Sequence, residues 1–316
     1  YVKAFVTCRG IVTREFVNGW DGEPWKALGD RTELSEIRRL ALPLDRGGYR
    51  LGEVPDGVLA IVRGIDVQKD CVYVVDRGFG IRGRDTWLIN FMKLPRQDGL
   101  RLADVWQSLD KYRAYRRLNG ESVAVQYEFV DSGHYTDDVY LGVAARRLAG
   151  YKAVPVKGKG GTSGLSPPYT VSPIEKTSDG KVIKLSVKLL LVNSDHWKTA
   201  VTSRLKGSFV VPDEDQGEGE VPGFYLPEVD EAGTMDMYFD QMTSEHRKLD
   251  LGKRGVGSAK YIWEKRGPGR QNHAFDAECY AFCGAELVGV RRLGVVEKKR
   301  PRPVAPQGPS WVSQAR

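Results

Sequence analysis

The sequence of 316 residues lacks the features that direct a protein into a membrane or through a secretion pathway. No apolar run approaches the length that spans a bilayer, and the first residues show no signal-peptide pattern. Only four cysteines are present, at positions 8, 71, 279 and 283, with neither a CxxC pair nor a histidine cluster beside them. This spacing favours reduced core thiols in a cytosolic protein.

A second absence concerns nucleotide hydrolysis. An ATP-binding loop would consist of GxxxxGK followed by Ser or Thr, and the Gly-rich segment 157–164 does not match it. We expect this segment to be a basic loop, with Lys157 and Lys159 either close to a nucleic-acid backbone or simply solvated. The net charge of +7 favours a polyanionic partner.

The composition, 41% hydrophobic and 10% aromatic, is that of a globular protein with a full core. Residues 1–55 do not resemble a complete domain, and their abrupt start predicts that a preceding domain has been removed. Residues 56–295 form the main predicted domain. Residues 296–316 are basic and Pro-rich, which predicts a disordered tail that either holds nucleic acid loosely or is solvated.

Two predicted strands end on acidic residues. An apolar, β-branched run over 59–66 ends on Asp66, and further strands are predicted over 71–77 and 86–91. Asp66 either opens a turn or, held rigidly at a strand end, serves as a ligand for a divalent cation. The predicted strand 123–130 is followed by Asp131 and then by a helix with Thr136 at its N-cap. If the two strands are parallel neighbours, their acids meet at one edge of the sheet.

A third acid lies on a predicted helix that starts after Asn272 and continues to Val290. Small residues at Ala274, Ala277, Ala281 and Gly284 form a stripe that would let this helix lie close against the sheet. Asp276 is one turn into this otherwise apolar helix. Because a buried unpaired charge is costly, we expect Asp276 to face a polar cleft, where a cation shared with the strand-end acids would satisfy it.

The remaining pattern predicts helices over 101–116, from Ser194 or Asp195 to Leu205, and over 235–245. It predicts strands over 151–156, 181–192 and 259–264. Antiparallel strands that open a domain and are followed by helices are typical of an α/β fold with a mixed sheet.

At this point the sequence resembles a known family, the large terminase subunits of tailed phages of the lambda GpA type. The resemblance covers nearly the whole chain, in the order of the family. The blocks that carry it are Phe16-Val17-Asn18, Gly22-Glu23-Pro24-Trp25, Gly64-Ile65-Asp66-Val67-Gln68, Asp131-Ser132-Gly133-His134, Thr136-Asp137-Asp138-Val139-Tyr140, Pro222-Gly223-Phe224, Thr243-Ser244-Glu245 and Asn272-His273-Ala274-Phe275-Asp276-Ala277-Glu278-Cys279-Tyr280-Ala281.

The resemblance implies the C-terminal nuclease of a DNA-packaging motor, with an RNase H-like (RuvC/integrase-like) fold of a mixed sheet flanked by helices. Residues 1–55 would then be a remnant of the connection to an ATPase domain. Its partners would be concatemeric double-stranded DNA, the terminase small subunit and the portal protein, in the cytoplasm of the host cell. The acidic cluster of the family corresponds to Asp66, Asp131 and Asp276. Some related terminases have Glu, with a longer reach, where this sequence has Asp131.

These residue types suit phosphodiester hydrolysis. Three carboxylates can hold two ions of Mg²⁺ or Mn²⁺, which together activate water, neutralise the phosphate and stabilise the leaving oxygen. Asp195 and Glu278 are further candidates for ligands, but Glu278 is two positions from Asp276 and points to another face of the helix. His134 and His273 either assist proton transfer or are ordinary polar neighbours.

Basic residues are expected to grip the DNA backbone without reading its sequence, which leaves the choice of cutting site to partner proteins. The predicted DNA-binding residues are Lys157, Lys159, Lys253, Arg254, Arg266 and Arg270.

Two other functions fit the same residues. A Holliday-junction resolvase or a transposase-like nuclease also combines strand-end acids with a helix acid, and would prefer junctions to linear duplex. A DNA-binding or portal-docking module without catalysis would keep its activity when Asp66 is replaced by Asn.

Overall fold

The computed structural model describes residues 32–96, 101–160, 167–207, 223–250 and 260–294. Its strands are β1 (Ala60–Val67), β2 (Cys71–Phe79), β3 (Thr86–Pro95), β4 (Ala114–Arg116), β5 (Ser122–Asp131), β6 (Ala153–Lys159), β7 (Tyr169–Lys176), β8 (Val182–Asn193), β9 (Phe224–Tyr225), β10 (Glu245–Asp250) and β11 (Lys260–Lys265). Its α-helices are α3 (Leu34–Arg38), α4 (Leu102–Asp110), α5 (Thr136–Leu148), α6 (Ser194–Gly207), α7 (Thr234–Met242) and α8 (His273–Val288).

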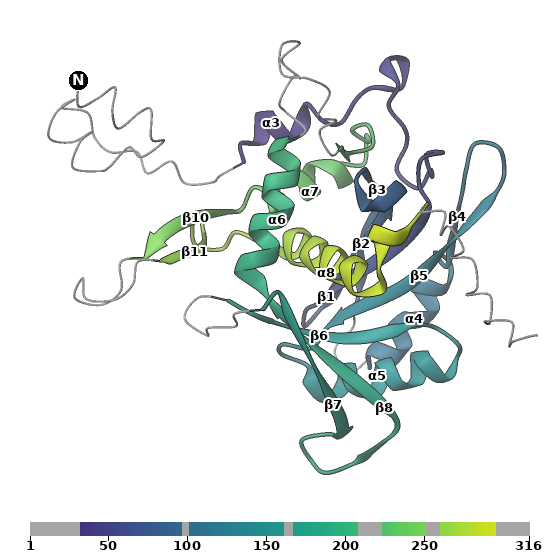
Figure 1. The fold of residues 1–316 in the computed structure, drawn as a ribbon, viewed down its shortest axis with the longest axis vertical. Coiled ribbons are helices and arrows are strands. Elements are labelled where there is room, and N and C mark those ends of the chain that lie inside the picture. The colour runs from purple at the N-terminus through teal and green to yellow at the C-terminus, as the bar shows by residue number, and fades with distance from the viewer. Residues whose placement is uncertain (1–31, 97–100, 161–166, 208–222, 251–259, 295–316) are drawn as a thin grey trace, which may run out of the picture.

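The described strands form a nine-stranded mixed sheet and a separate hairpin of β10 and β11 (Figure 1). The sheet order is β7-β8-β6-β5-β1-β2-β3-β9, with β4 paired to β5 outside this path. Strand β1 is antiparallel to β2 and parallel to β5, and β5, β6 and β8 continue the parallel part. The carboxyl ends of β1 and β5, which carry Asp66 and Asp131, therefore meet at one edge of the sheet.

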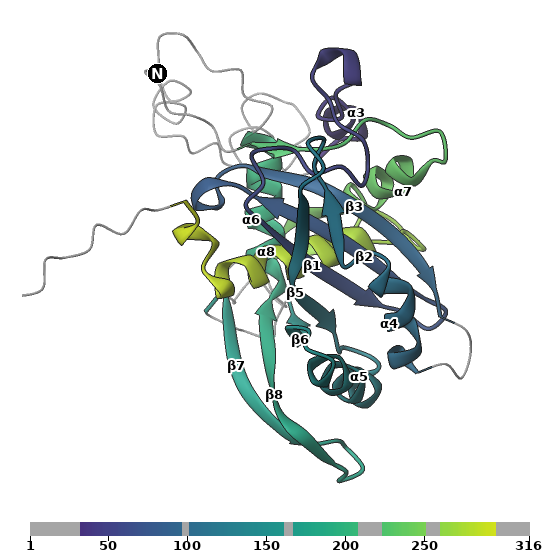
Figure 2. The same cartoon turned by 90° about the vertical axis from the view of Figure 1, so that its right-hand side faces the viewer.

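Helices cover both faces of the sheet (Figures 1 and 2). One core places β-sheet residues against α6, α7 and α8, and a second places them against α4 and α5. Strand β1 is buried along its whole length, because its side chains point alternately to two faces of the sheet that are both covered. Ile65 and Val67 belong to the core with α4 and α5, whereas Gly64 and Asp66 face α8.

Helix α8 lies close against β1 and β5, as the stripe of small residues predicts. The backbone of Ala277 approaches Gly64 so closely that a side chain at Gly64 would not fit. Further along the helix, Gly284 leaves room for the ring of Phe129 on β5. This close packing fixes the N-terminal turn of α8 at the sheet edge where the strand-end acids lie.

Buried ion pairs tie the strands together below this edge. Arg63 on β1 pairs with Asp76 on β2 at 2.7 Å and with Glu128 on β5 at 3.2 Å. Arg77 pairs with Glu278 of α8, and both side chains are fully buried. Because removing one member of a buried pair leaves an uncompensated charge, these contacts fix the register of the strands and of α8 strongly.

The predicted strands 59–66, 71–77 and 86–91 and the helix after Asn272 are confirmed, with small shifts at their ends. The predicted helix 101–116 is wrong in its second half. Helix α4 ends at Asp110, and residues 114–116 pair with β5, so sheet pairing overrides the helical spacing. The predicted helix 235–245 also ends early, at Met242. There the hydroxyl groups of Thr243 and Ser244 donate to carbonyls of the last turn.

The predicted basic loop 157–164 is corrected in part. Lys157 and Lys159 belong to β6, which pairs in parallel with β8, and residues 161–166 lie outside the described residues. Strand β7, which the sequence pattern did not indicate, pairs with β8 in an arm that extends from the body of the protein (Figure 2). The predicted tail 296–316 and most of the predicted segment 1–55 also lie outside the described residues.

Two findings concern the cysteines and the expected absence of a membrane-spanning segment. Cys279 and Cys283 are buried free thiols on α8, as predicted. No helix in the described ranges has the length and apolar character needed to cross a membrane.

Candidate active site

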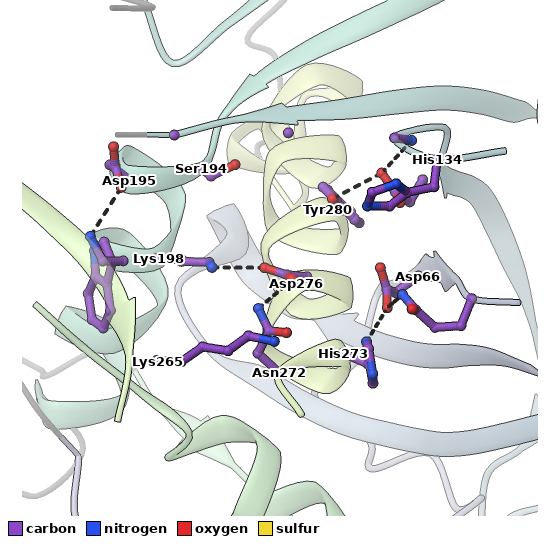
Figure 3. Close-up of a pocket in the computed structure, with 16 residues that line it drawn as sticks. Asp66, His134, Ser194, Asp195, Lys198, Lys265, Asn272, His273, Asp276 and Tyr280 are labelled. Carbon is purple, nitrogen blue, oxygen red and sulfur yellow. Dashed lines mark hydrogen bonds and ion pairs between the residues drawn. The ribbon is translucent and has the colours of Figure 1, made fainter. Parts of the chain in front are cut away.

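A polar pocket of about 450 Å³ opens where the ends of β1 and β5 meet the first turns of α6 and α8 (Figure 3). All three predicted acids, Asp66, Asp131 and Asp276, line it. The remaining lining residues are Gln68, Gly133, His134, Gly158, Gly160, Ser194, Asp195, Lys198, Trp263, Lys265, Asn272, His273 and Tyr280. The fold thus brings together acids that are up to 210 positions apart in the sequence.

Asp66 is 4% exposed and is held from two sides. Its Oδ2 accepts a hydrogen bond from Nε2 of Gln68 at 2.7 Å and lies 2.7 Å from Nδ1 of His273. The His273 ring stacks on Tyr73, with 4.5 Å between the ring centroids. Burial, together with the negative charge of Asp276, raises the pKa of Asp66, and the contact with His273 opposes that rise.

Asp131 ends β5 beside the same pocket. Its Oδ1 accepts hydrogen bonds from the backbone N–H of Gly133 and from the hydroxyl of Tyr280, each at 3.2 Å. Burial raises the pKa of Asp131 to about 7, and the charges of Asp66 and Asp276 add to the rise. Asp66 and Asp131 thus share the causes of their raised pKa, which are burial and the charge of a neighbouring carboxylate.

Asp276 takes part in a closed ring of four side chains from α6, α8 and β10. Its Oδ1 lies 3.0 Å from Nζ of Lys198, and its Oδ2 accepts from Nδ2 of Asn272 at 2.8 Å. Glu245 closes the ring, 2.7 Å from Lys198 and 2.6 Å from Asn272. Burial lowers the pKa of Lys198, but the charges of Asp276 and Glu245 outweigh it and raise the pKa above its ordinary value.

The donor set fits a hard divalent cation, although the acids do not form a complete coordination group. Across the residues that the structure describes, no three His, Cys, Asp or Glu side chains are arranged to hold a metal ion. Oδ1 of Asp66 and Oδ2 of Asp131 nevertheless make no hydrogen bond to the described part of the chain. Carboxylate oxygens at a polar pocket are the ligands that Mg²⁺ prefers.

The other predicted site residues lie in different surroundings. His134 lines the pocket and is exposed, and Asp195 lines it from α6, where it accepts from the backbone N–H of Trp263 at 3.4 Å. Glu278 is fully buried in its ion pair with Arg77, away from the pocket. This agrees with the expectation that Glu278 points to another face of α8.

Of the predicted DNA-binding residues, Lys159 is exposed at the end of β6, between Gly158 and Gly160 of the pocket wall. Arg270 is 44% exposed and pairs with Asp240 at 3.2 Å. Arg266 pairs with Glu33 at 3.2 Å and donates to two backbone carbonyls. Lys253 and Arg254 lie outside the described residues.

The sequence analysis missed Lys198 and Tyr280 as pocket residues, and Glu245 as the buried partner of Lys198. A signal for Lys198 was present, because the buried stripe of α6 consists of Trp197, Lys198, Val201, Thr202 and Leu205. A lysine within such a stripe requires a buried anionic partner. The identity of that partner, however, depends on contacts with other elements.

A mixed sheet flanked by helices, with acids at the carboxyl ends of its central strands, defines the class of RNase H-like nucleases. The match to a family makes the assignment specific: the family described as terminase large subunit gpA, endonuclease domain, matches residues 12–298, and the chain belongs to it. No match to a curated protein was found, and none to a solved structure.

Proposed function

We propose that the chain is the metal-dependent endonuclease of a viral DNA-packaging motor, and that it cuts concatemeric double-stranded DNA. Membership in the terminase endonuclease family supports a nuclease role in packaging. The observation that carries the finer proposal is the convergence of Asp66, Asp131 and Asp276 on one pocket. We infer that Asp66, Asp131 and Asp276 would together hold the divalent ions.

Two ions of Mg²⁺ or Mn²⁺ bound there would activate a water, neutralise the scissile phosphate and stabilise the leaving oxygen. The residues around the acids hold the carboxylates for this task. Gln68 and His273 hold one oxygen of Asp66 and leave the other without a hydrogen bond to the described residues. Gly133 and Tyr280 do the same for Asp131.

The surroundings of the pocket suit the DNA backbone. Lys265 of β11 lines the pocket, and Lys159 lies at its rim. Such lysines attract phosphates without reading bases, so cleavage would be largely independent of sequence. We propose that the terminase small subunit and the portal protein select the cutting site and the DNA end, in the cytoplasm of the host cell.

The test is cleavage of linear duplex DNA by the purified 316-residue chain with Mg²⁺ or Mn²⁺, with EDTA as the metal-free control. We expect Asp66→Asn to abolish cleavage and to retain DNA affinity. Asp70→Asn is the matched control, since Asp70 is exposed in the turn after β1 and does not line this pocket.

Each outcome decides the proposal. Cleavage that persists in EDTA or in Asp66→Asn would contradict it. A preference for four-way junctions over linear duplex would favour the junction-resolvase alternative. If the wild-type chain binds DNA but cuts neither linear duplex nor junctions, the result would favour a module without catalysis.

A further inference from the structure

The ammonium of Lys198 lies 3.0 Å from Asp276, one of the three predicted metal-binding carboxylates. Its side chain is 10% exposed, between Asp276 at 3.0 Å and Glu245 at 2.7 Å. Figure 3 shows the carboxylate of Asp276 turned toward Lys198 and Asn272 rather than toward Asp66. The ammonium of Lys198 thus takes the place beside Asp276 where a bound cation would otherwise neutralise it.

Both oxygens of Asp276 are engaged in this arrangement, one by Lys198 and the other by Asn272. A divalent ion that uses Asp276 must therefore displace Lys198 from Oδ1 or approach against its positive charge. Either event weakens metal binding, because the ammonium and the divalent ion carry like charges.

Glu245 gives Lys198 a second anionic partner. It is 5% exposed, at the start of β10, and also accepts from Asn272. When Lys198 leaves Asp276, its charge stays paired with Glu245, so no isolated buried cation results. Without Glu245, Lys198 would depend on Asp276 alone and would hold it more firmly.

We propose that Lys198 is a positioning residue that competes with the divalent cation for Asp276, and that Glu245 sets the strength of this competition. The inference rests on the proposed function, since it assumes that Asp276 is a metal ligand. It accounts for the orientation of the Asp276 carboxylate, whose two oxygens contact Lys198 and Asn272.

The experiment measures Mn²⁺ affinity of the 316-residue chain without DNA, by calorimetry and by Mn²⁺ electron paramagnetic resonance. The double variant Lys198→Met/Glu245→Gln removes one charge of each sign, and the glutamine amide that replaces the carboxylate retains an oxygen for Asn272. We expect it to bind Mn²⁺ roughly tenfold more tightly than wild type, because the ammonium that contacts Oδ1 of Asp276 is removed. Glu245→Gln alone should bind Mn²⁺ more weakly, since Lys198 then relies on Asp276.

Three controls make the outcome decisive. Lys248→Met makes the same substitution on β10 at a lysine that is 55% exposed and paired with Glu264, and it should leave Mn²⁺ affinity unchanged. In an Asp276→Asn background the double variant should have no effect. Urea unfolding of the metal-free variants identifies any loss of fold. The double variant is expected to fold, because it removes the buried Lys198 together with its buried partner Glu245 and leaves Asp276 at the pocket.

Opposite shifts for the double variant and for Glu245→Gln support the inference, because a merely structural role would shift both in one direction. Tight Mn²⁺ binding by the double variant, with no binding by wild type, would also support it. If wild type binds Mn²⁺ and both variants match it, the inference is overturned and the proposed function stands. If neither wild type nor the double variant binds Mn²⁺, both fail.

Discussion

A Cβ atom on Gly64 would overlap the carbonyl oxygen of Ala277. Gly64 is on β1, two residues before Asp66, and Ala277 follows Asp276 on α8. The same close approach of helix and strand therefore sets the separation of two of the three acids. The absence of a side chain at one position thus contributes directly to the geometry of the pocket.

Gly64→Ala should destabilise the protein and separate Asp66 from Asp276. Overpacking of this kind costs roughly 1–3 kcal/mol, because the helix must move away from the strand. Urea unfolding and the DNA cleavage assay measure the two effects. Gly267→Ala is the control, since a Cβ there meets no atom within 4 Å and its φ is not in the left-handed region. Full cleavage by a stable Gly64→Ala variant would contradict this account.

The acid Asp131 should make the metal-free protein less stable as the pH rises. The pKa of Asp131 is raised to about 7 in the folded chain, so the folded state binds its proton more readily than the unfolded state. The resulting stability is present below about pH 4, the ordinary pKa of an aspartate, and is lost as the pH rises through about 7. The loss is on the order of a few kcal/mol.

Asp131→Asn isolates this contribution, because Asn is neutral at every pH and its oxygen can still accept from Gly133 and Tyr280. Unfolding free energies of both proteins, measured in EDTA from about pH 4 to about pH 8, give the comparison. We expect the difference between variant and wild type to grow in favour of the variant toward the alkaline end of this range. A constant difference over the range would contradict the raised pKa.

Two acids that lie two positions apart on α8 should behave differently. Glu278 is fully buried with Arg77, so Glu278→Ala leaves an unpaired buried arginine and should cost about 3–5 kcal/mol of stability. Asp276→Asn should keep the fold and lose cleavage, because its side chain faces the pocket. Thermal unfolding and DNA cleavage of both variants test this contrast, and a stable Glu278→Ala protein would refute it.

Lysines at the pocket should contribute to DNA affinity through phosphates. Lys159→Ala and Lys265→Ala should each weaken binding of any duplex and lower the slope of log affinity against log salt by about 0.9. Lys188→Ala on the β8 arm is the control, since Lys188 is exposed and does not line the pocket. Fluorescence anisotropy in EDTA between about 50 and 200 mM salt measures the slopes. Equal slopes for all three variants would place the DNA elsewhere.

Local patterns were enough to predict the elements that carry the acids. Apolar runs predict β1 and β5, and the stripe of small residues predicts the close packing of α8, because these patterns depend only on near neighbours along the chain. The strand β4 and the end of α7 were mispredicted, since pairing and hydrogen bonding with other segments override local spacing there.

Which acids meet, and which side chains hold them, depends on how distant parts of the chain pack together. Asp66 and Asp131 share an edge because β1 and β5 are parallel neighbours, a pairing that bridges 65 positions of sequence. The ring of Lys198, Glu245, Asn272 and Asp276 joins three elements whose mutual position no local pattern encodes. Local periodicity fixes which face of an element is buried, whereas the charges that lie opposite one another depend on how those faces pack across the whole chain.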